Sequence, residues 1–240
     1  MRINNDCWLL NKPIAHRGLW GNGIIENSLP AYENAIKHGY PIEIDVYQSK
    51  DGVLLSFHDQ TLKRMTGADG YIFEKTYEEI KKLNLNGSEH KIPTLKQVLD
   101  LVDGKVPLLI EFKDMPDKSY VNSAVNMLKE YKGEFAVQSF NPLILKKIKK
   151  LAPEFLRGIL ATASHGKNLP FFKRQIIKNM SLNFLIKPDF ISYSFQDLPL
   201  KKSKTKNLPV ITWTVTDQQT ADKIKPFAKN VIFEKFIPNP

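Results

Sequence analysis

Charged side chains interrupt two segments that otherwise have the apolar composition of buried β-strands. Strands buried on both faces of a parallel sheet are expected to be continuously apolar, yet the first segment contains Glu43 and Asp45. The second contains Glu111 near its end and is followed by Lys113. Because side chains alternate faces along a strand, Glu43 and Asp45 are expected to point the same way. We therefore predict that three carboxylates converge at the carboxyl ends of two strands.

Three converging carboxylates repel one another unless a cation lies close to them. Carboxylate oxygens suit a hard ion better than zinc, so Glu43, Asp45 and Glu111 predict a site for one divalent cation, Ca²⁺ or Mg²⁺. From these residues alone, the alternative is a cluster of internal ion pairs with Arg17 and Lys113.

Two histidines also lie close to the ends of expected strands. His16 ends the first strand within Ala15-His16-Arg17-Gly18, and His58 comes shortly after the carboxylate-bearing strand. Imidazoles titrate near neutral pH, so His16 and His58 suit a general acid and a general base in phosphodiester cleavage. A lone histidine is more often structural, but a pair beside carboxylates is a stronger signal. Arg17 offers a planar fork of donors that suits a phosphate.

The elements that must position these side chains alternate between strand and helix. Strands are predicted at about 13–16, 41–46, 107–112, 134–138, 155–160, 189–194, 208–214 and 230–233. Helical patterns are predicted at 28–38, 94–103, 118–131, 142–151, 169–180 and 217–227. Segment 195–207 has the composition of a loop, and no helix is expected after Phe233. Since no glycine-rich nucleotide-binding loop follows any strand, the order favours an α/β fold of the (β/α)8 TIM-barrel type.

Length and composition agree with one barrel domain over residues 1–240. The residues are 42% hydrophobic and 25% charged, as in an ordinary globular protein. The one cysteine, Cys7, excludes an internal disulfide and a cysteine-based metal site. No secretory signal or apolar run of membrane-spanning length is present. We expect a cytoplasmic protein without stable membrane insertion, and leave its oligomeric state open.

The net charge of +10 favours anionic partners. Part of the excess lies in two lysine runs, at 146–150 and 201–206. Because no aromatic residues are interleaved with these lysines, we interpret both runs as solvated surface and expect no nucleic-acid partner. The expected partner is a small phosphate ester.

Several motifs resemble the glycerophosphodiester phosphodiesterase family in their order and spacing. The first block comprises His16-Arg17-Gly18, Glu26-Asn27-Ser28, Glu43-x-Asp45-Val46, Asp51-Gly52 and His58-Asp59-x-x-Leu62-x-Arg64-x-Thr66. Later landmarks are Ile92-Pro93-Thr94-Leu95, Glu111-Phe112-Lys113, Gln138-Ser139-Phe140-Asn141 and Trp213-Thr214-Val215. The resemblance extends from His16 to Phe233, and its first block is far more specific than a single short motif.

The resemblance implies a role for each candidate residue within a TIM barrel. His16 and His58 would form the acid/base pair, and Glu43, Asp45 and Glu111 would hold the divalent cation. Arg17 and Lys113 would clamp the phosphate, and Trp213 would line the substrate pocket. Glu26 and Asn27 would be the family's loop pair. Two alternatives stay open: Trp213 is equally consistent with a core residue, and Asn27 with a cap of the helix after it.

The activity that the resemblance implies is hydrolysis of a small glycerophosphodiester to sn-glycerol 3-phosphate and an alcohol, through attack by the substrate's own hydroxyl and a cyclic phosphate. One alternative is a lysophospholipase D or phospholipase C-like enzyme, which would need an apolar landing surface for lipids. Another is a non-catalytic barrel that binds phosphate ligands, although a binder needs no acid/base pair. The last strand ends in Ile232-Phe233-Glu234-Lys235-Phe236, where many family members have Thr-Asp-x-Pro, and this departure affects the expected substrate preference.

Overall fold

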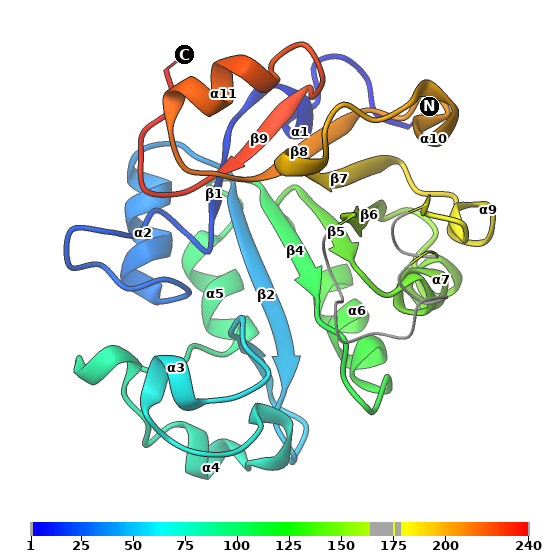
Figure 1. Ribbon diagram of the computed structural model, residues 1–240. Helices are drawn as coiled ribbons and strands as arrows, with labels where there is room; N and C mark the ends of the chain where they lie inside the picture. Colours follow the sequence, from blue (N-terminus) through cyan, green and yellow to red (C-terminus); the bar gives the residue numbers. More distant parts are fainter. Residues whose placement is uncertain (1, 164–174, 176–178, 240) are drawn as a thin grey trace.

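Eight parallel strands close into a barrel in the computed structural model, which describes residues 2–163, 175 and 179–239. Closure follows from the first strand, β1, which pairs with β2 on one side and with the last strand, β9, on the other (Figure 1). All pairs around the ring are parallel. The predicted α/β TIM barrel is therefore confirmed.

Each predicted barrel strand is present, with ends that differ from the prediction by at most two residues. The barrel strands are β1 (Ile14–His16), β2 (Ile42–Gln48), β4 (Leu108–Phe112), β5 (Phe135–Ser139), β6 (Leu156–Ala161), β7 (Phe190–Ser194), β8 (Val210–Val215) and β9 (Asn230–Phe233). A ninth strand, β3 (Leu54–Ser56), folds back antiparallel to the end of β2 after the turn at Asp51-Gly52.

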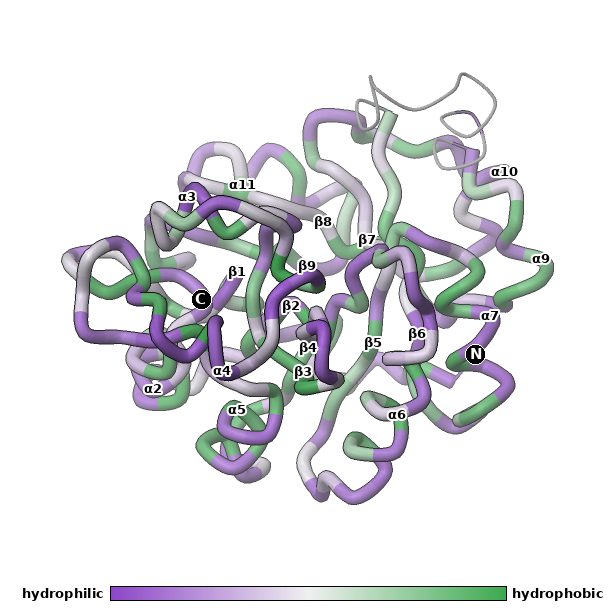
Figure 2. The backbone as a smooth tube through the Cα atoms, turned by 90° about the horizontal axis from the view of Figure 1, so that it is seen from below, coloured by the Kyte–Doolittle hydropathy of each residue, from purple (hydrophilic) through white to green (hydrophobic). Residues whose placement is uncertain are grey.

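Helices surround the ring of strands (Figure 2). They are α1 (Trp8–Asn11), α2 (Leu29–Lys37), α3 (Lys63–Thr66), α4 (Tyr77–Ile80), α5 (Leu95–Val102), α6 (Tyr120–Glu130), α7 (Pro142–Leu151), α9 (Asn183–Ile186), α10 (Lys202–Thr205) and α11 (Gln218–Ile224). Single 3₁₀ turns occur at η1 (Ile72–Glu74), η2 (Leu85–Gly87) and η3 (Phe195–Asp197). No helix follows β9 in the described part of the chain, as expected, and most of the helix predicted at 169–180 lies outside the described residues.

The loop predicted at 195–207 is wrong in part, because η3 and α10 lie within it. The sequence of α10 is Lys-Ser-Lys-Thr. It contains no apolar residue, so it carries none of the helical periodicity on which such a prediction depends.

Apolar side chains fill the amino-terminal end of the barrel. Residues from strands on opposite sides of the ring belong to one packed cluster, and so they must meet inside it: Ile14, Leu109, Ala136, Phe190, Ile211 and Ile232. Space for Phe190 comes from Gly158, where a Cβ atom would lie only 2.1 Å from the phenyl ring. Side chains two residues further along each strand point to the same interior face. In a TIM barrel the carboxyl ends of the strands form the mouth, so these side chains line it.

Candidate active site

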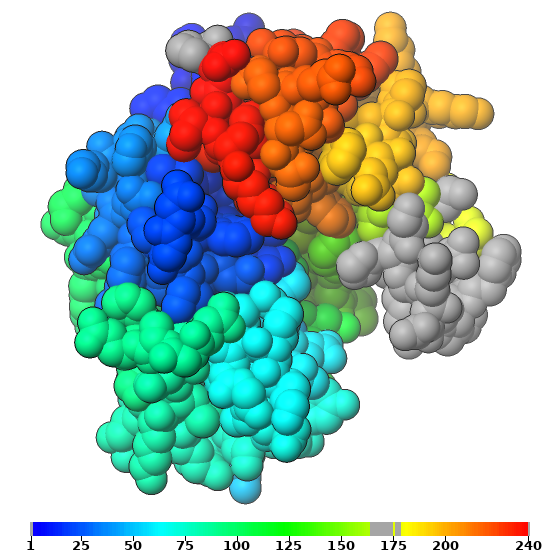
Figure 3. Space-filling view, turned by 60° about the vertical axis from the view of Figure 1, so that its left-hand side comes forward, coloured from blue at the N-terminus to red at the C-terminus, as the bar shows by residue number. Residues whose placement is uncertain are grey.

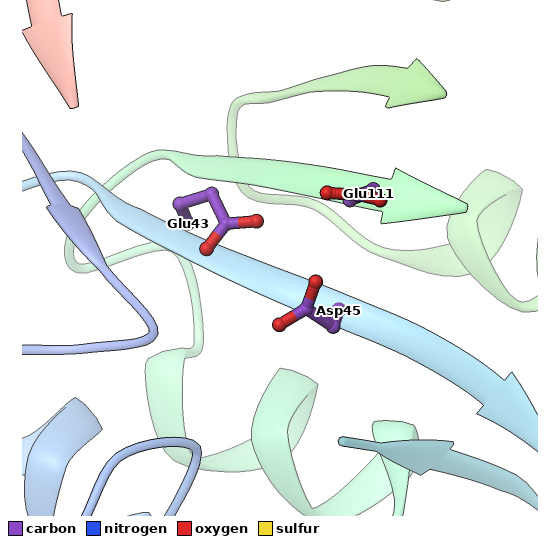
Figure 4. Close-up of side chains that lie close together, drawn as sticks. All are labelled: Glu43, Asp45 and Glu111. Carbon is purple, nitrogen blue, oxygen red and sulfur yellow. The ribbon is translucent and has the colours of Figure 1, made fainter. Parts of the chain in front are cut away.

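The three carboxylates converge inside the barrel mouth. Glu43 and Asp45 come from β2 and Glu111 from β4, and their side chains point toward one another (Figure 4). Asp45 and Glu111 are register partners on the paired strands. One oxygen from each of the three carboxylates lies within 4.8 Å of the others, and all three residues are buried. The geometry is therefore that of a compact set of oxygen ligands.

Burial makes this negative charge costly. Desolvation raises the pKa of Glu43 well above its usual range, and the charges of Asp45 and Glu111 raise it further. Burial would also raise the pKa of Asp45, but Lys113, His58 and Arg17 hold it below its usual value. A cation among the three carboxylates would offset the repulsion that Glu43 experiences.

Lys113 provides part of that compensation. Its Nζ lies 3.1 Å from Asp45 Oδ1 and 2.8 Å from Glu111 Oε1, so the ion-pair alternative is realised for two of the three carboxylates. One ammonium does not balance three carboxylates, and Glu43 is not among the ion pairs of Lys113. The donor set therefore fits a hard divalent cation together with Lys113.

Arg17 enters the site through both its backbone and its side chain. It has a left-handed φ of 58°, and its backbone N–H donates to Glu43 Oε2 over 3.1 Å. Its Nη1 donates to Glu26 Oε1 over 2.7 Å, and its Nε lies 3.8 Å from Asp45 Oδ2. Glu26 thus holds the guanidinium beside the carboxylate cluster.

Asn27 does not cap the helix that follows it. Ser28 is the N-cap of α2 and accepts from the backbone N–H of Ala31. Asn27 has a left-handed φ of 50°, and its Nδ2 donates to Asp45 Oδ2 over 3.0 Å. Tyr32 in turn donates to Asn27 Oδ1 over 2.8 Å. The capping interpretation was wrong because this turn directs the amide toward β2.

Both candidate histidines, His16 and His58, have a carboxylate at Nδ1. His16 Nδ1 lies 2.7 Å from Glu234 Oε2, and His58 Nδ1 lies 2.6 Å from Asp59 Oδ1. Burial lowers the pKa of His16, an effect that the bond to Glu234 opposes only in part. Each ring is therefore oriented with Nε2 as the atom that can meet a ligand. Neither partner was predicted from the sequence, although Asp59 adjoins His58 and Glu234 directly follows a barrel strand.

Trp213 lies between the barrel mouth and the apolar cluster that fills the amino-terminal end of the barrel. It packs against this cluster, and its ring contacts the ring of Phe140 edge to face, with 5.6 Å between the ring centres. Its Nε1 is buried and has no hydrogen-bond partner among the described residues. Both interpretations of Trp213 therefore stay open: the ring packs on core residues, and the indole N–H lacks a partner among the described residues.

Comparison with known proteins gives one consistent result. The model of the "Glycerophosphoryl diester phosphodiesterase family" matches residues 16–235. A glycerophosphodiester phosphodiesterase of Caldanaerobacter subterraneus is 36% identical over 61% of this chain and 65% of the relative. The human glycerophosphodiester phosphodiesterase 1 is 26% identical over 84% of this chain and 71% of its own.

Solved structures agree with these relatives. A phosphodiesterase of Oleispira antarctica, in complex with its product sn-glycerol-3-phosphate, superposes with a TM-score of 0.80 at 25% identity, covering 94% of this chain and 93% of its own. A glycerophosphodiester phosphodiesterase of Parabacteroides distasonis has a TM-score of 0.74 at 26% identity, covering 92% of each chain. The barrel fold, the buried acidic cluster and the relatives together show that the protein is a phosphoric diester hydrolase. The chain belongs to the glycerophosphoryl diester phosphodiesterase family.

Arg64, which was not predicted as a site residue, joins two parts of this site. Its Nη2 donates to Glu26 Oε1 over 2.7 Å, the same oxygen that Arg17 contacts. Its Nε donates to Asp59 Oδ2 over 2.5 Å. One guanidinium thus fixes both the carboxylate that holds Arg17 and the carboxylate that holds His58.

Replacement of Arg64 is expected to impair turnover more than folding. Arg64→Ala frees Glu26 and Asp59, and turnover should fall by about tenfold or more, as is common when a supporting residue is lost. The side chain is 47% exposed, so the melting temperature should change little. The matched control is Lys63→Ala, which removes only an exposed ion pair with Asp69. Equal turnover of the two variants would show that Arg64 has no positioning role.

Proposed function

We propose that this protein hydrolyses small glycerophosphodiesters to sn-glycerol 3-phosphate and an alcohol. The observation that carries the proposal is the combination of a buried carboxylate cluster with two histidines, His16 and His58, each held at Nδ1 by a carboxylate. A binding protein would need no such pair. The Oleispira antarctica relative, whose structure holds sn-glycerol-3-phosphate, supports the same product.

His16 and His58 are the proposed acid/base pair. One imidazole removes the proton from the glycerol hydroxyl adjacent to the phosphodiester, and that oxygen forms a bond to phosphorus. The bond from phosphorus to the alcohol oxygen breaks as the other imidazole donates a proton to the departing oxygen. Water then opens the resulting cyclic glycerophosphate, with the roles of the two histidines reversed.

The remaining residues balance charge and shape the pocket. Arg17 and Lys113 are proposed to contact the phosphoryl oxygens, because each already lies beside the carboxylate cluster. Trp213 is proposed to line the pocket with its free N–H. A divalent cation, Ca²⁺ or Mg²⁺, held by Glu43, Asp45 and Glu111 would supply further positive charge for the phosphoryl oxygens and the attacking hydroxyl.

We propose a small, water-soluble diester rather than a lipid as the substrate, in keeping with the sn-glycerol-3-phosphate held by the Oleispira antarctica relative. In the part of the chain that the structure describes, no helix has the length and apolar character needed to cross a bilayer. A cytoplasmic location and the lack of a nucleic-acid partner stay predictions.

A coupled assay for released glycerol 3-phosphate tests the proposal. The panel contains sn-glycero-3-phosphocholine, sn-glycero-3-phosphoethanolamine and a lysophosphatidylcholine. We expect glycerol 3-phosphate from the first two and little choline release from the third. Turnover of the lysolipid above that of both soluble diesters would favour the lipid-directed alternative. No turnover of any panel member, with Ca²⁺ or Mg²⁺ supplied, would contradict the proposed function.

Loss of either imidazole is expected to slow turnover strongly. His16→Ala and His58→Ala should each lose at least roughly a hundredfold in kcat, the usual contribution of a positioned proton carrier. Both variants should retain cation affinity in calorimetric titration, because neither histidine is assigned as a ligand. His38→Ala, on the exposed end of α2, is the matched control. Lost affinity for the cation would instead make the affected histidine a ligand.

A further inference from the structure

Glu234 has no role in the charge balance described above, yet it lies beside His16, one of the two proposed acid/base groups. It directly follows β9, where Phe233 is the register partner of Ala15 on β1. The residues that come next along the chain, His16 and Glu234, therefore lie side by side at the barrel mouth. Figure 3 shows the C-terminal segment against the N-terminal segment on this side of the molecule.

The contact between the two side chains is short and shielded. His16 Nδ1 lies 2.7 Å from Glu234 Oε2, and the side chains are only 15% and 14% exposed. An ionised carboxylate can only accept a hydrogen bond, so this contact requires the proton on Nδ1. In the neutral ring the lone pair is then on Nε2.

Further bonds hold both partners in place around this contact. The backbone N–H of Glu234 donates to Val215 O over 3.0 Å, which ties it to β8. Trp20 Nε1 donates to His16 O over 2.9 Å. Lys235 Nζ lies 5.6 Å from the centre of the Trp20 ring and 3.7 Å from Glu234 Oε1. The backbone of Glu234 is therefore bound to β8, while its carboxylate contacts His16 at the end of β1.

The second histidine has the same arrangement from an unrelated part of the fold. His58 Nδ1 meets Asp59 Oδ1 at 2.6 Å, although Asp59 adjoins it in the chain whereas Glu234 is 218 residues from His16. An ion pair that merely fastened the chain end would not be expected to repeat at the other ring. The shared feature is that both rings present Nε2.

We propose that Glu234 is a positioning residue that holds His16 in the tautomer whose Nε2 exchanges a proton with the diester. The inference rests on the proposed function, and it gives a role to the residue at which the last strand ends differently from many family members. Glu234 itself does not touch the substrate in this assignment.

Kinetics of full-length variants with sn-glycero-3-phosphocholine test the assignment. Glu234→Ala should lower kcat by about tenfold to a hundredfold while KM changes by less than about threefold. Glu234→Gln should lose less, because its amide oxygen can still accept from Nδ1. Glu33→Ala, the matched control, removes an exposed carboxylate of α2 and should stay within about twofold of the wild type.

Nitrogen NMR of histidine-labelled protein provides a readout that a purely structural role would not change. The His16 signals are identified by their absence in His16→Ala, and the neutral wild-type ring should carry its proton on Nδ1. In Glu234→Ala that ring should shift toward the Nε2-protonated tautomer. An Nε2 proton in the wild type, unchanged kcat in Glu234→Ala, or an increase in KM alone would overturn the assignment. The tautomer is measured without substrate, so failure of the Glu234 assignment can be told apart from failure of the proposed function. The proposed function would be contradicted by a wild-type protein that has no turnover.

Discussion

Removal of divalent cations is expected to abolish turnover of glycerophosphodiesters, and Ca²⁺ or Mg²⁺ is expected to restore it. The reason is the charge at the barrel mouth: Glu43, Asp45 and Glu111 are buried, their oxygens lie within 4.8 Å, and Lys113 is paired with only two of them. Without a cation, the phosphate would meet an acidic surface. The measurement is glycerol 3-phosphate release after exhaustive chelation and after stepwise return of each ion.

Glu43→Gln separates the cation site from the fold. Burial and the neighbouring charges raise the pKa of Glu43, so its ionised form is unfavourable in the folded protein. A group whose pKa is raised on folding contributes less to stability as the pH rises through that range. The cation-free variant should therefore melt at the same temperature as the wild type or above it, while cation affinity and activity fall sharply. Glu33→Gln, on the exposed face of α2, is the matched control.

Two results would contradict this account. Full activity after verified removal of all divalent ions would exclude the three-carboxylate site. A cation affinity of Glu43→Gln equal to that of Glu33→Gln, measured by calorimetric titration, would exclude Glu43 as a ligand.

The barrel could be predicted because its signals are local. Each strand is a short apolar run bounded by turn residues, and the charges within β2 and β4 are exceptions that strand alternation alone directs to one face. The convergence of Glu43, Asp45 and Glu111 followed from this alternation and from the parallel pairing of β2 with β4. The helix α10 escaped prediction because a single turn without apolar residues carries no periodicity.

The partners that orient the site could not be predicted in the same way. The contact of His16 with Glu234 depends on closure of the ring, which brings together residues 218 positions apart. Arg64 lies in a motif beside Asp59, but its bond to Glu26 spans 38 positions and depends on how α3 lies over the loop before α2. Asn27 had a plausible local role as a cap, and a left-handed backbone turn gave it another. Such contacts depend on tertiary packing, which a single sequence does not encode in local patterns.

A substrate that lacks the glycerol 2-hydroxyl is expected to bind, but its rate of reaction should fall by at least roughly a thousandfold. In the proposed mechanism this hydroxyl, not water, attacks phosphorus in the first step. Intramolecular attack can correspond to effective molarities of about 10⁵ M or more when the geometry is favourable. No serine, threonine or cysteine in the matched motifs is assigned as a covalent nucleophile, so the substrate's own hydroxyl is the simplest choice.

The comparison uses two deoxy analogues of sn-glycero-3-phosphocholine. The 2-deoxy compound lacks the proposed nucleophile, whereas the 1-deoxy compound keeps it and has lost the same number of oxygens. Choline release should nearly cease with the first and persist with the second, while both should compete with the natural diester. Phosphorus NMR of a quenched time course should also reveal a cyclic glycerophosphate. Comparable rates for both analogues would make water the nucleophile, and one of the two histidines, His16 or His58, would then have to act as its base. The family and the fold would be unaffected by that result, but the first bond to phosphorus would come from solvent.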